Sequence, residues 1–338
     1  MSKKVRWGVL GAARIAWRRV IPAMQHGPYS EVIALASRNL EKARTTAEPL
    51  GIPKVYGSYE ELLADPEIDA IYNPLPNHLH IPWTQKAMQA GKHVLCEKPF
   101  ALNLAELEKF IKFCGDYPHL KVGEAFMVKS HPLWHEVRRQ VQSGAFGEVR
   151  SIHGHFSYFN ANPENVRNVP EWGGGGMYDI GVYPLTLSRY VLNSEPRSVM
   201  AMLERDPEMG IDHLGSALLD FGGIHSIFTC SMQMIGHQTF EILGTKKRLE
   251  VKIPYNAPED RKNIFTSYFG DFSREDGEVH EFDLCNQYTL QGNNFSKAIL
   301  EDGEVPVRLE DTWGNTAALE AIFESAKTGK QVEVKQRS

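Results

Sequence analysis

The sequence has few cysteines, no long apolar run and no block of basic residues. Its four cysteines are widely spaced and form no Cys-x-x-Cys pair, which excludes a disulfide scaffold and a cysteine-based zinc ribbon. No apolar run approaches the ~20 residues that a membrane-spanning helix requires. The net charge is -5 and no basic block is large enough for a nucleic-acid surface, since the two arginines of the candidate pair Arg18-Arg19 are far too few. With no apolar signal region after Met-Ser-Lys-Lys, these absences predict a soluble cytoplasmic protein that binds neither nucleic acid nor a membrane.

Apolar strand-like runs alternate with helical segments over roughly the first 123 residues. The runs are Val5–Leu10, Val32–Ala36, Ile68–Asn73, Val94–Cys96 and Lys121–Glu124. Such alternation predicts a doubly wound parallel sheet, the Rossmann fold, for an α/β domain over residues 1–123. Because 338 residues are too many for one small core, we expect a second domain over residues 124–338.

The second part of the chain alternates with period two. This pattern predicts an α+β domain with an open, predominantly antiparallel sheet and helices on one face. An apolar face left open by the chain itself requires a partner, so we expect a homodimer, or a tetramer built from dimers, formed through this sheet. Phe240 and Val251 are the kind of residues that a monomer would expose. The alternating runs are Arg150–Phe159, Val199–Arg205, Ser216–Phe221, His225–Gln233, Phe240–Leu243 and Arg248–Ile253.

A glycine-rich turn follows the first strand. Gly11-x-Ala13-x-x-Ala16 keeps the first glycine of the dinucleotide fingerprint, in which small residues allow the pyrophosphate to approach the backbone. Alanine is a common last residue, whereas Ala13 departs from the pattern. We expect Gly11, Ala13, Arg14 and Ile15 to contact a dinucleotide.

The end of the second strand predicts which dinucleotide is bound. NAD enzymes place an acidic residue there, which accepts hydrogen bonds from the ribose 2′-hydroxyl. This chain has Ser37 and Arg38 instead, and a hydroxyl and a guanidinium suit a 2′-phosphate. The sequence therefore predicts NADP(H) as the cofactor.

Two pairs of histidines invite a metal interpretation. His78 and His80 lie in the loop after the third long strand, and His153 and His155 lie on an alternating run. Neither pair has a cysteine or carboxylate in ligand spacing, so we expect no metal site.

Two further motifs carry the chemistry of hydride transfer, which needs a proton donor or acceptor beside the reacting oxygen. Glu97-Lys98-Pro99 follows an apolar strand, so Lys98 is delivered to the ligand crevice at the carboxyl edge of the sheet. Four glycines at residues 173–176 then precede Asp179 and Tyr183, which share one face if the segment is helical. The glycines let the backbone pass close to a ligand, and Gly181 leaves room for one.

Glu97-Lys98-Pro99 at this distance from the turn, with a glycine run and Asp-x-Gly-x-Tyr, resembles the glucose–fructose oxidoreductase/inositol dehydrogenase (Gfo/Idh/MocA) family. The tyrosine version is typical of dihydrodiol dehydrogenases, xylose dehydrogenases and sugar ketoreductases. The resemblance implies that Tyr183 is the general acid/base, that Lys98 lies beside it, and that Asp179 binds a substrate hydroxyl or orients Lys98. It also implies a cis Lys98–Pro99 peptide. Cofactor contacts are implied for Leu75, Asn77, His78, Glu97 and Lys98, and substrate contacts for Lys98, Glu124, Arg167, Asp179 and Tyr183, although Arg167 could equally form a structural salt bridge.

The sequence thus predicts an NADP(H)-dependent oxidoreductase of the EC 1.1.1 type. It would transfer a hydride between the nicotinamide and a CH–OH or C=O group of a carbohydrate-like small molecule. One alternative is a nucleotide-sugar ketoreductase, because Ala13–Arg19 looks like the stretch seen in those family members. Others are a non-catalytic cofactor-binding regulator, which has no need of both Lys98 and Tyr183, and a redox-assisted glycosidase that retains NAD.

Overall fold

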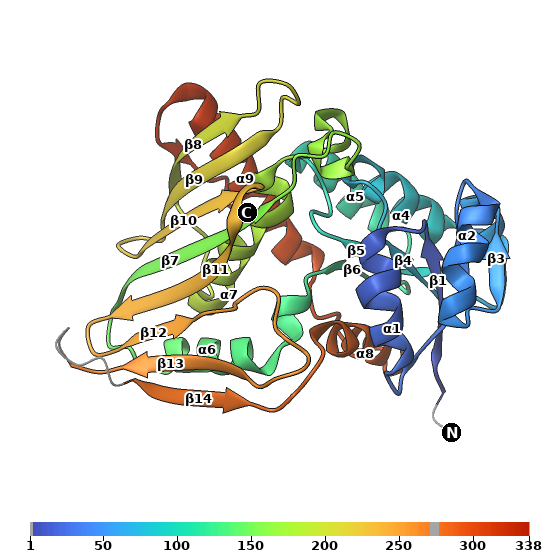
Figure 1. Cartoon of the computed structure of the whole chain (residues 1–338), viewed down its shortest axis with the longest axis horizontal. Helices are drawn as coiled ribbons and strands as arrows, with labels where there is room; N and C mark the ends of the chain where they lie inside the picture. Colours follow the sequence, from blue (N-terminus) through green and yellow to red (C-terminus); the bar gives the residue numbers. More distant parts are fainter. Residues whose placement is uncertain (1–2, 271–276, 338) are drawn as a thin grey trace. The chain divides into compact units, whose positions relative to one another are not determined.

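The computed structural model describes residues 3–270 and 277–337 (Figure 1). The chain packs into two compact units, each built from two stretches of sequence. The first unit comprises the residues up to Ser130 together with Cys285–Trp313, and the second comprises His131–Leu284 together with the residues from Gly314 onward.

The first unit is built on a six-stranded parallel sheet in the order β3-β2-β1-β4-β5-β6. This is the Rossmann strand order, in which ligands bind beyond the carboxyl ends of the strands. The predicted parallel sheet is therefore confirmed. Its strands are β1 (Val5–Leu10), β2 (Ser30–Ala36), β3 (Lys54–Tyr56), β4 (Ala70–Asn73), β5 (His93–Glu97) and β6 (Val122–Ala125).

Helices cover both faces of this sheet. Trp7 packs into a core cluster that contains residues of α1 (Ile21–Gln25), α2 (Leu40–Ala47) and α8 (Gln287–Leu300). Gly8 points the other way, where Leu62 of α3 (Tyr59–Ala64) fills the space beside it. Helices α4 (His80–Gln89) and α5 (Leu104–Cys114) also belong to this unit.

Helix α8 belongs to the first unit although it lies far along the chain. The Trp7 indole donates to the Ser296 hydroxyl at 3.1 Å, and the ring centroids of Trp7 and Phe295 are 5.7 Å apart. The compact units therefore do not follow the single sequence break predicted between residues 123 and 124. A polar contact between residues 289 positions apart leaves no local pattern in the sequence.

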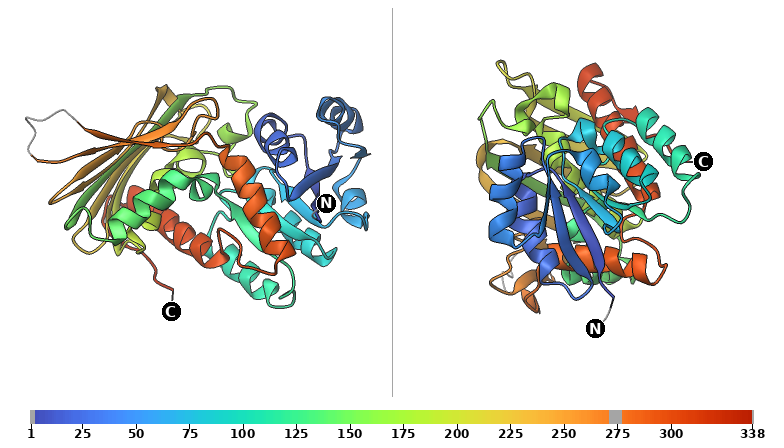
Figure 2. Two further views of the ribbon diagram at one scale, coloured as in Figure 1. Left: turned by 90° about the horizontal axis from the view of Figure 1, so that it is seen from below. Right: turned by 90° about the vertical axis from the view of Figure 1, so that its right-hand side faces the viewer.

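The second unit contains a nine-stranded sheet in the order β14-β13-β12-β11-β7-β10-β9-β8-β15. Its pairs are antiparallel except for the parallel pair β7 and β10, which agrees with the predicted predominantly antiparallel sheet. Helices α6 (Pro132–Gln142), α7 (Val182–Leu192) and the later part of α9 (Leu309–Thr328) lie on one face (Figure 2). The strands are β7 (Val149–Phe159), β8 (Ser198–Arg205), β9 (Asp212–Asp220), β10 (His225–Ser231), β11 (Gln233–Gly244), β12 (Arg248–Val251), β13 (Asn263–Tyr268), β14 (Glu278–Phe282) and β15 (Val332–Glu333).

The prediction that Phe240 and Val251 face outward is wrong. Phe240 is fully buried and its ring meets Trp134 of α6 at 5.2 Å, edge to face, while Val251 is its cross-strand partner. Side chains alternate between the two faces of a strand, so an error of one residue in phase reverses the face. The outward apolar row consists instead of Met200, Leu218 and Ile227, which are paired across β8, β9 and β10.

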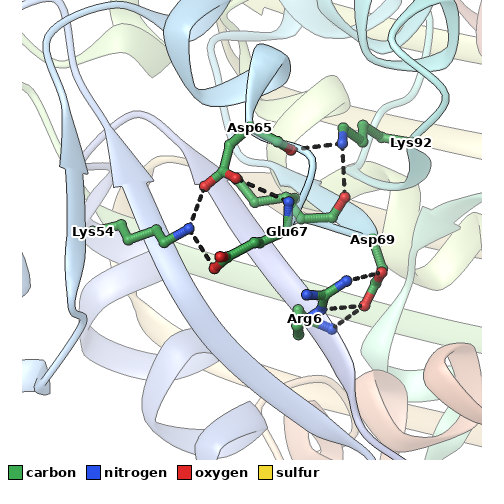
Figure 3. Close-up of polar contacts among 7 residues, drawn as sticks. Arg6, Lys54, Asp65, Glu67, Asp69 and Lys92 are labelled. Carbon is green, nitrogen blue, oxygen red and sulfur yellow. Dashed lines mark hydrogen bonds and ion pairs between the residues drawn. The ribbon is translucent and has the colours of Figure 1, made fainter.

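An ionic cluster secures the amino ends of the parallel strands (Figure 3). Arg6 of β1 forms a two-pronged ion pair with Asp69, with nitrogen–oxygen distances of 2.8 and 3.0 Å. The Lys54 ammonium of β3 lies 2.7 Å from Asp65 and 2.6 Å from Glu67. The buried Lys92 donates to the main-chain carbonyls of Asp65 and Ile68, both at 2.8 Å. These contacts lie at the edge of the sheet opposite the one where dinucleotides bind.

Asp65 makes this cluster sensitive to acid. Burial opposes ionisation of its carboxyl, but hydrogen bonds from Lys54, Tyr56 and the Glu67 N–H outweigh it and lower the pKa to about 2. Since the pKa is lowered on folding, the carboxylate stabilises the fold above pH ~4, and that stability is lost as the pH falls towards about 2.

We expect Asp65→Asn to lower the free energy of unfolding by about 1–2 kcal/mol at pH 7, because the variant loses the charge that pairs with Lys54. The expected loss is this small because water screens the partly exposed Lys54. The difference from the wild type should shrink between pH 4 and pH 3, as measured by urea unfolding. Glu60→Gln is the matched control, since the Glu60–Lys86 pair is largely exposed and should contribute little. If the loss of unfolding free energy in Asp65→Asn did not change with pH, the lowered pKa of Asp65 would be contradicted.

Candidate functional site

The turn after β1 is closed around Gly11. Gly11 has a φ of 85°, and its N–H donates to the Ala36 carbonyl at the end of β2 at 2.7 Å. A side chain there would be strained, and its Cβ would lie 3.0 Å from the Leu75 side chain and 3.5 Å from the Tyr59 hydroxyl. Arg14 is exposed and begins the helical segment that continues through the π-helical residues Ala16–Val20 into α1. The turn therefore presents a narrow cradle of main chain at the start of a helix, the arrangement that binds phosphates.

The end of β2 places Ser37 and Arg38 beside this turn. Ser37 is buried and its hydroxyl oxygen accepts from the Asn39 N–H at 3.2 Å, so the hydroxyl proton can be donated to another group. Asn39 in turn caps α2 by accepting from Lys42 N–H, as its sequence position predicts. Arg38 is exposed. These two side chains are suited to a phosphate that approaches from solvent.

Tyr59 lies near Gly11 and Arg38, and the sequence did not predict it as part of this site. Burial raises the pKa of its hydroxyl, while the charge of Arg38 and a hydrogen bond from it act in the opposite direction. Its ring packs edge to face on Trp83 at 4.7 Å. The available sequence signal was the helix cap at Ser58, which accepts from Glu61 N–H at 3.2 Å and thereby fixes where Tyr59 begins α3.

The loop after β4 carries Leu75, Asn77 and His78. The buried Asn73 shapes it, because its side chain accepts from Leu75 N–H at 3.3 Å and donates to the His80 carbonyl at 3.1 Å. Leu75 is buried against the Gly11 turn, and Asn77–Leu79 forms a short 3-10 helix leading into α4. The structure thus brings the Leu75 side chain next to Gly11, and its contact with a cofactor stays a prediction.

The turn after β5 carries Lys98. Glu97 accepts from the Tyr72 hydroxyl at 2.6 Å, and the Lys98–Pro99 peptide is cis, as expected. Beyond it, Glu124 of β6 accepts from the Phe100 N–H and from the Thr312 hydroxyl, both at 2.9 Å. Burial raises the pKa of Glu124 to about 7, against the effect of these hydrogen bonds. Glu124 is 4% exposed, and both of its carboxylate oxygens accept hydrogen bonds from the protein. Its position is therefore better suited to supporting the turn that carries Lys98 than to the predicted contact with substrate.

In the second unit, Asp179 is held by two donors. Its carboxylate accepts from Arg167 Nε at 2.9 Å and from the Tyr158 hydroxyl at 2.5 Å. The charge of Asp179 is the chief cause of the raised pKa of Arg167, and Tyr183 also contributes. Burial and Asp179 raise the pKa of Tyr158. The predicted Arg167 and Asp179 are therefore in contact, and Tyr158 is a partner that sequence reasoning missed.

Tyr183 lies in the same continuous helical segment as Asp179. Asp179 lies in the π-helical part, Met177–Gly181, and Tyr183 lies at the start of α7. The Tyr183 ring is 7% exposed, with its centroid 5.6 Å from those of Phe156 and Tyr255. Insertion of an extra residue into a helical turn is found frequently at functional sites.

The glycines of this segment serve the packing of the chain itself. A Cβ at Gly174 would lie 2.5 Å from the Arg167 carbonyl oxygen, and one at Gly175, where φ is 123°, would collide with Asp212. A Cβ at Gly181 would collide with Met177. Asp212 accepts from the Met177 N–H at 2.6 Å and so fixes the start of the helical segment. Room for a ligand, predicted from these glycines, is taken here by neighbouring protein atoms.

Two general properties of the described residues bear on function. Over residues 3–270 and 277–337, no group of three or more His, Cys, Asp or Glu side chains is arranged to hold a metal ion. His153 contacts Ser151, and His155 contacts Ser157. Among the helices formed by this part of the chain, none has the length and apolar character needed to cross a bilayer.

Each of the two units matches a model of a known protein family. A model described as an oxidoreductase family with an NAD-binding Rossmann fold matches residues 5–120, and a GFO/IDH/MocA C-terminal domain matches residues 134–250. The chain is 43% identical to an uncharacterized oxidoreductase of Rhizobium meliloti, covering 96% of this chain and 98% of the relative. It is 34% identical to a D-xylose 1-dehydrogenase (NADP(+)) of Haloferax volcanii, with coverage of 97% and 99%.

A solved structure has the same arrangement of elements. A 3-ketoreductase from Actinomadura kijaniata, crystallised with NADP and TDP-benzene, matches with a TM-score of 0.89 at 29% identity, covering 96% of this chain and 98% of that one. The family models account for most of both units, and the relatives are matched over nearly their whole length. The chain is therefore a member of the Gfo/Idh/MocA family of NAD(P)-binding oxidoreductases.

Proposed function

We propose that this protein is an NADP(H)-dependent dehydrogenase or reductase that acts on a CH–OH or C=O group of a sugar or related cyclic polyol. One observation carries the proposal: Ser37 and Arg38 directly follow β2 beside the Gly11 turn, where an NAD enzyme has an acidic residue. The related D-xylose dehydrogenase uses NADP, and the related ketoreductase binds it. A cytoplasmic location remains a prediction from the sequence.

The residues of the first unit fit this cofactor. Gly11, Ala13, Arg14 and Ile15 would hold the pyrophosphate against the main chain, because Gly11 has no side chain to fill the cradle. Ser37 and Arg38 would bind the 2′-phosphate, and Leu75, Asn77, His78 and Glu97 would line the nicotinamide half. When bound, the cofactor supplies or accepts the hydride.

The protein's own residues would handle the proton. We propose that Tyr183 exchanges a proton with the substrate oxygen and that Lys98 supplies positive charge and hydrogen bonds to the same oxygen. Asp179 would fix Arg167 and Tyr158 around the reacting group, and Arg167 would contact substrate hydroxyls. Arg167 forms a salt bridge with Asp179, the structural alternative that the sequence left open, while its contact with substrate hydroxyls is part of the proposal.

The test is a screen with NADP⁺ and NADPH, read at 340 nm. It should include D-xylose, D-glucose, a trans-dihydrodiol and a dTDP-linked keto-sugar. We expect reduction of NADP⁺ with at least one free sugar or diol and weak activity with NAD⁺. If calorimetry detected no NADP⁺ binding, or if NAD⁺ bound as tightly, the proposal would be wrong.

The second candidate is a nucleotide-sugar ketoreductase. The observation that favours it is the likeness, over 96% of this chain, to a 3-ketoreductase bound to TDP-benzene, together with the Ala13–Arg19 stretch. The same screen separates the two candidates. NADPH oxidation with the dTDP-linked keto-sugar alone would favour the ketoreductase.

We also propose a homodimer, formed through the face of the second unit's sheet that the helices leave open. Met200, Met202 and Ile227 are 48%, 72% and 44% exposed there, and a second copy would cover them. A paired substitution, Met202→Glu with Ile227→Glu, should convert the dimer to a monomer, because it places charges in an apolar contact. Sedimentation velocity at micromolar concentration is the measurement, with Leu40→Glu in α2 as the control. A wild-type monomer would overturn the dimer.

A further inference from the structure

His80 is a buried histidine whose two ring nitrogens both face main-chain carbonyl oxygens. It lies at the start of α4 in the first unit and is 1% exposed. Its Nδ1 is 2.8 Å from the Pro99 oxygen, and its Nε2 is 2.7 Å from the Leu75 oxygen. Both distances are those of hydrogen bonds. The ring therefore bridges two segments that are 24 residues apart in sequence.

The two carbonyls belong to the two loops on which the proposed function depends. Leu75 packs against the Gly11 turn, where its side chain would lie 3.0 Å from a Cβ at that glycine. Pro99 directly follows Lys98. A side chain that fixes both loops would set the position of the cofactor cradle relative to the Lys98 ammonium, and small errors of position are costly in hydride transfer.

The number of hydrogen bonds that the His80 ring can donate to the two carbonyls depends on its protonation state. Burial, aided by the nearby Lys98 and His78, lowers the pKa of His80 to about 4 against the effect of the two carbonyls. At neutral pH the ring then carries one proton, which is shared between two tautomers: in one, Nδ1 donates to Pro99, and in the other, Nε2 donates to Leu75, so that each hydrogen bond is present for part of the time. Each nitrogen serves one loop, and the two contacts can therefore be removed separately.

We propose that His80 is a positioning residue that ties the cofactor loop at Leu75 to the turn that carries Lys98. The proposal rests on the proposed function in one respect, that these loops hold NADP(H) and the catalytic lysine. The contacts themselves lie within the first unit and can be tested without any ligand.

Asparagine and glutamine separate the two contacts. The amide nitrogen of asparagine falls near the place of histidine Nδ1, and that of glutamine falls near Nε2. His80→Asn should keep the bond to Pro99 and lose the bond to Leu75, and His80→Gln should do the reverse. His80→Leu should lose both.

The Asn and Gln variants are expected to change different constants. His80→Asn should raise the Kd for NADP⁺, measured by calorimetry without substrate, by roughly 2- to 5-fold, which is less than the factor for one full hydrogen bond because the neutral ring donates to Leu75 in only one of its two tautomers, and it should leave kcat near the wild-type value. His80→Gln should leave that Kd nearly unchanged and lower kcat by roughly the same factor, with the best substrate of the screen. Hydrogen exchange of the unliganded protein should rise over residues 74–79 in His80→Asn and over residues 97–102 in His80→Gln.

His131→Asn is the matched control. His131 is equally buried, lies in the second unit and caps α6 by accepting from Leu133 N–H at 3.1 Å, a contact that asparagine can keep. It should leave the Kd, kcat and the exchange of both peptides unchanged. If the Asn and Gln variants altered the same peptide and the same constant, or if His80→Leu changed only the melting temperature, the positioning role would be refuted. Failure of the wild type to bind NADP⁺ would refute the proposed function instead, and the exchange data would still decide the role of His80.

Discussion

Replacing Tyr183 by phenylalanine is expected to lower kcat by about 10²–10⁴-fold, the usual contribution of general acid–base catalysis. The substitution removes the hydroxyl and keeps the ring that packs against Phe156 and Tyr255. Folding and the Kd for NADP⁺ should therefore stay near their wild-type values. Stopped-flow or steady-state rates on the best substrate of the screen give the measurement, and a melting curve reports on folding.

Lys98→Met tests the proposed role of Lys98 in the same proton transfer. It should cost a similar factor, and the double variant should lose less than the product of the two single losses, because groups that act as a unit are not additive. Tyr190→Phe is the matched control on the same helix. Its ring lies under Arg138 at 4.6 Å, a contact that phenylalanine keeps, so kcat should be normal. If Tyr183→Phe retained normal kcat, the proton would have to be transferred by another group, of which Lys98 is the first to examine.

The second large effect is expected at Arg38. Arg38→Ala should weaken NADP⁺ binding by about 1.5–3 kcal/mol, the range for a hydrogen bond to a charged group. NAD⁺ lacks the 2′-phosphate, so its Kd should barely change, and calorimetry with both dinucleotides gives the comparison.

Arg44→Ala provides the control for Arg38, because Arg44 is an exposed arginine of the following helix α2. It should leave both dissociation constants unchanged. Equal losses for NADP⁺ and NAD⁺ in Arg38→Ala would mean that the side chain stacks or packs and does not bind the phosphate.

Features with a local cause could be predicted from the sequence. Strand β1 has the bounds Val5–Leu10 that its pattern predicts, and β7 (Val149–Phe159) begins one residue before the predicted run Arg150–Phe159. These features depend on neighbouring residues, so a short window of sequence contains all their determinants. The parallel sheet was predictable for the same reason, since each strand and its following helix form a local unit.

Features that depend on distant partners could not be predicted in this way. Tyr158 reaches Asp179 across 21 positions, and Asp212 reaches Met177 across 35. The roles expected of Asp179 and of the glycine run changed once these partners were known. His80 was interpreted only as a loop histidine, because the carbonyls of Leu75 and Pro99 are invisible in a pattern of side chains.

The return of the chain to the first unit has a consequence for the order of synthesis. Trp7 completes its packing only with Phe295 and Ser296, and Glu124 completes its hydrogen bonds only with Thr312. A ribosome releases these partners after the whole segment 131–284 has emerged. The Rossmann sheet can therefore assemble early on a nascent chain, but its core stays open on one side until helix α8 has been translated.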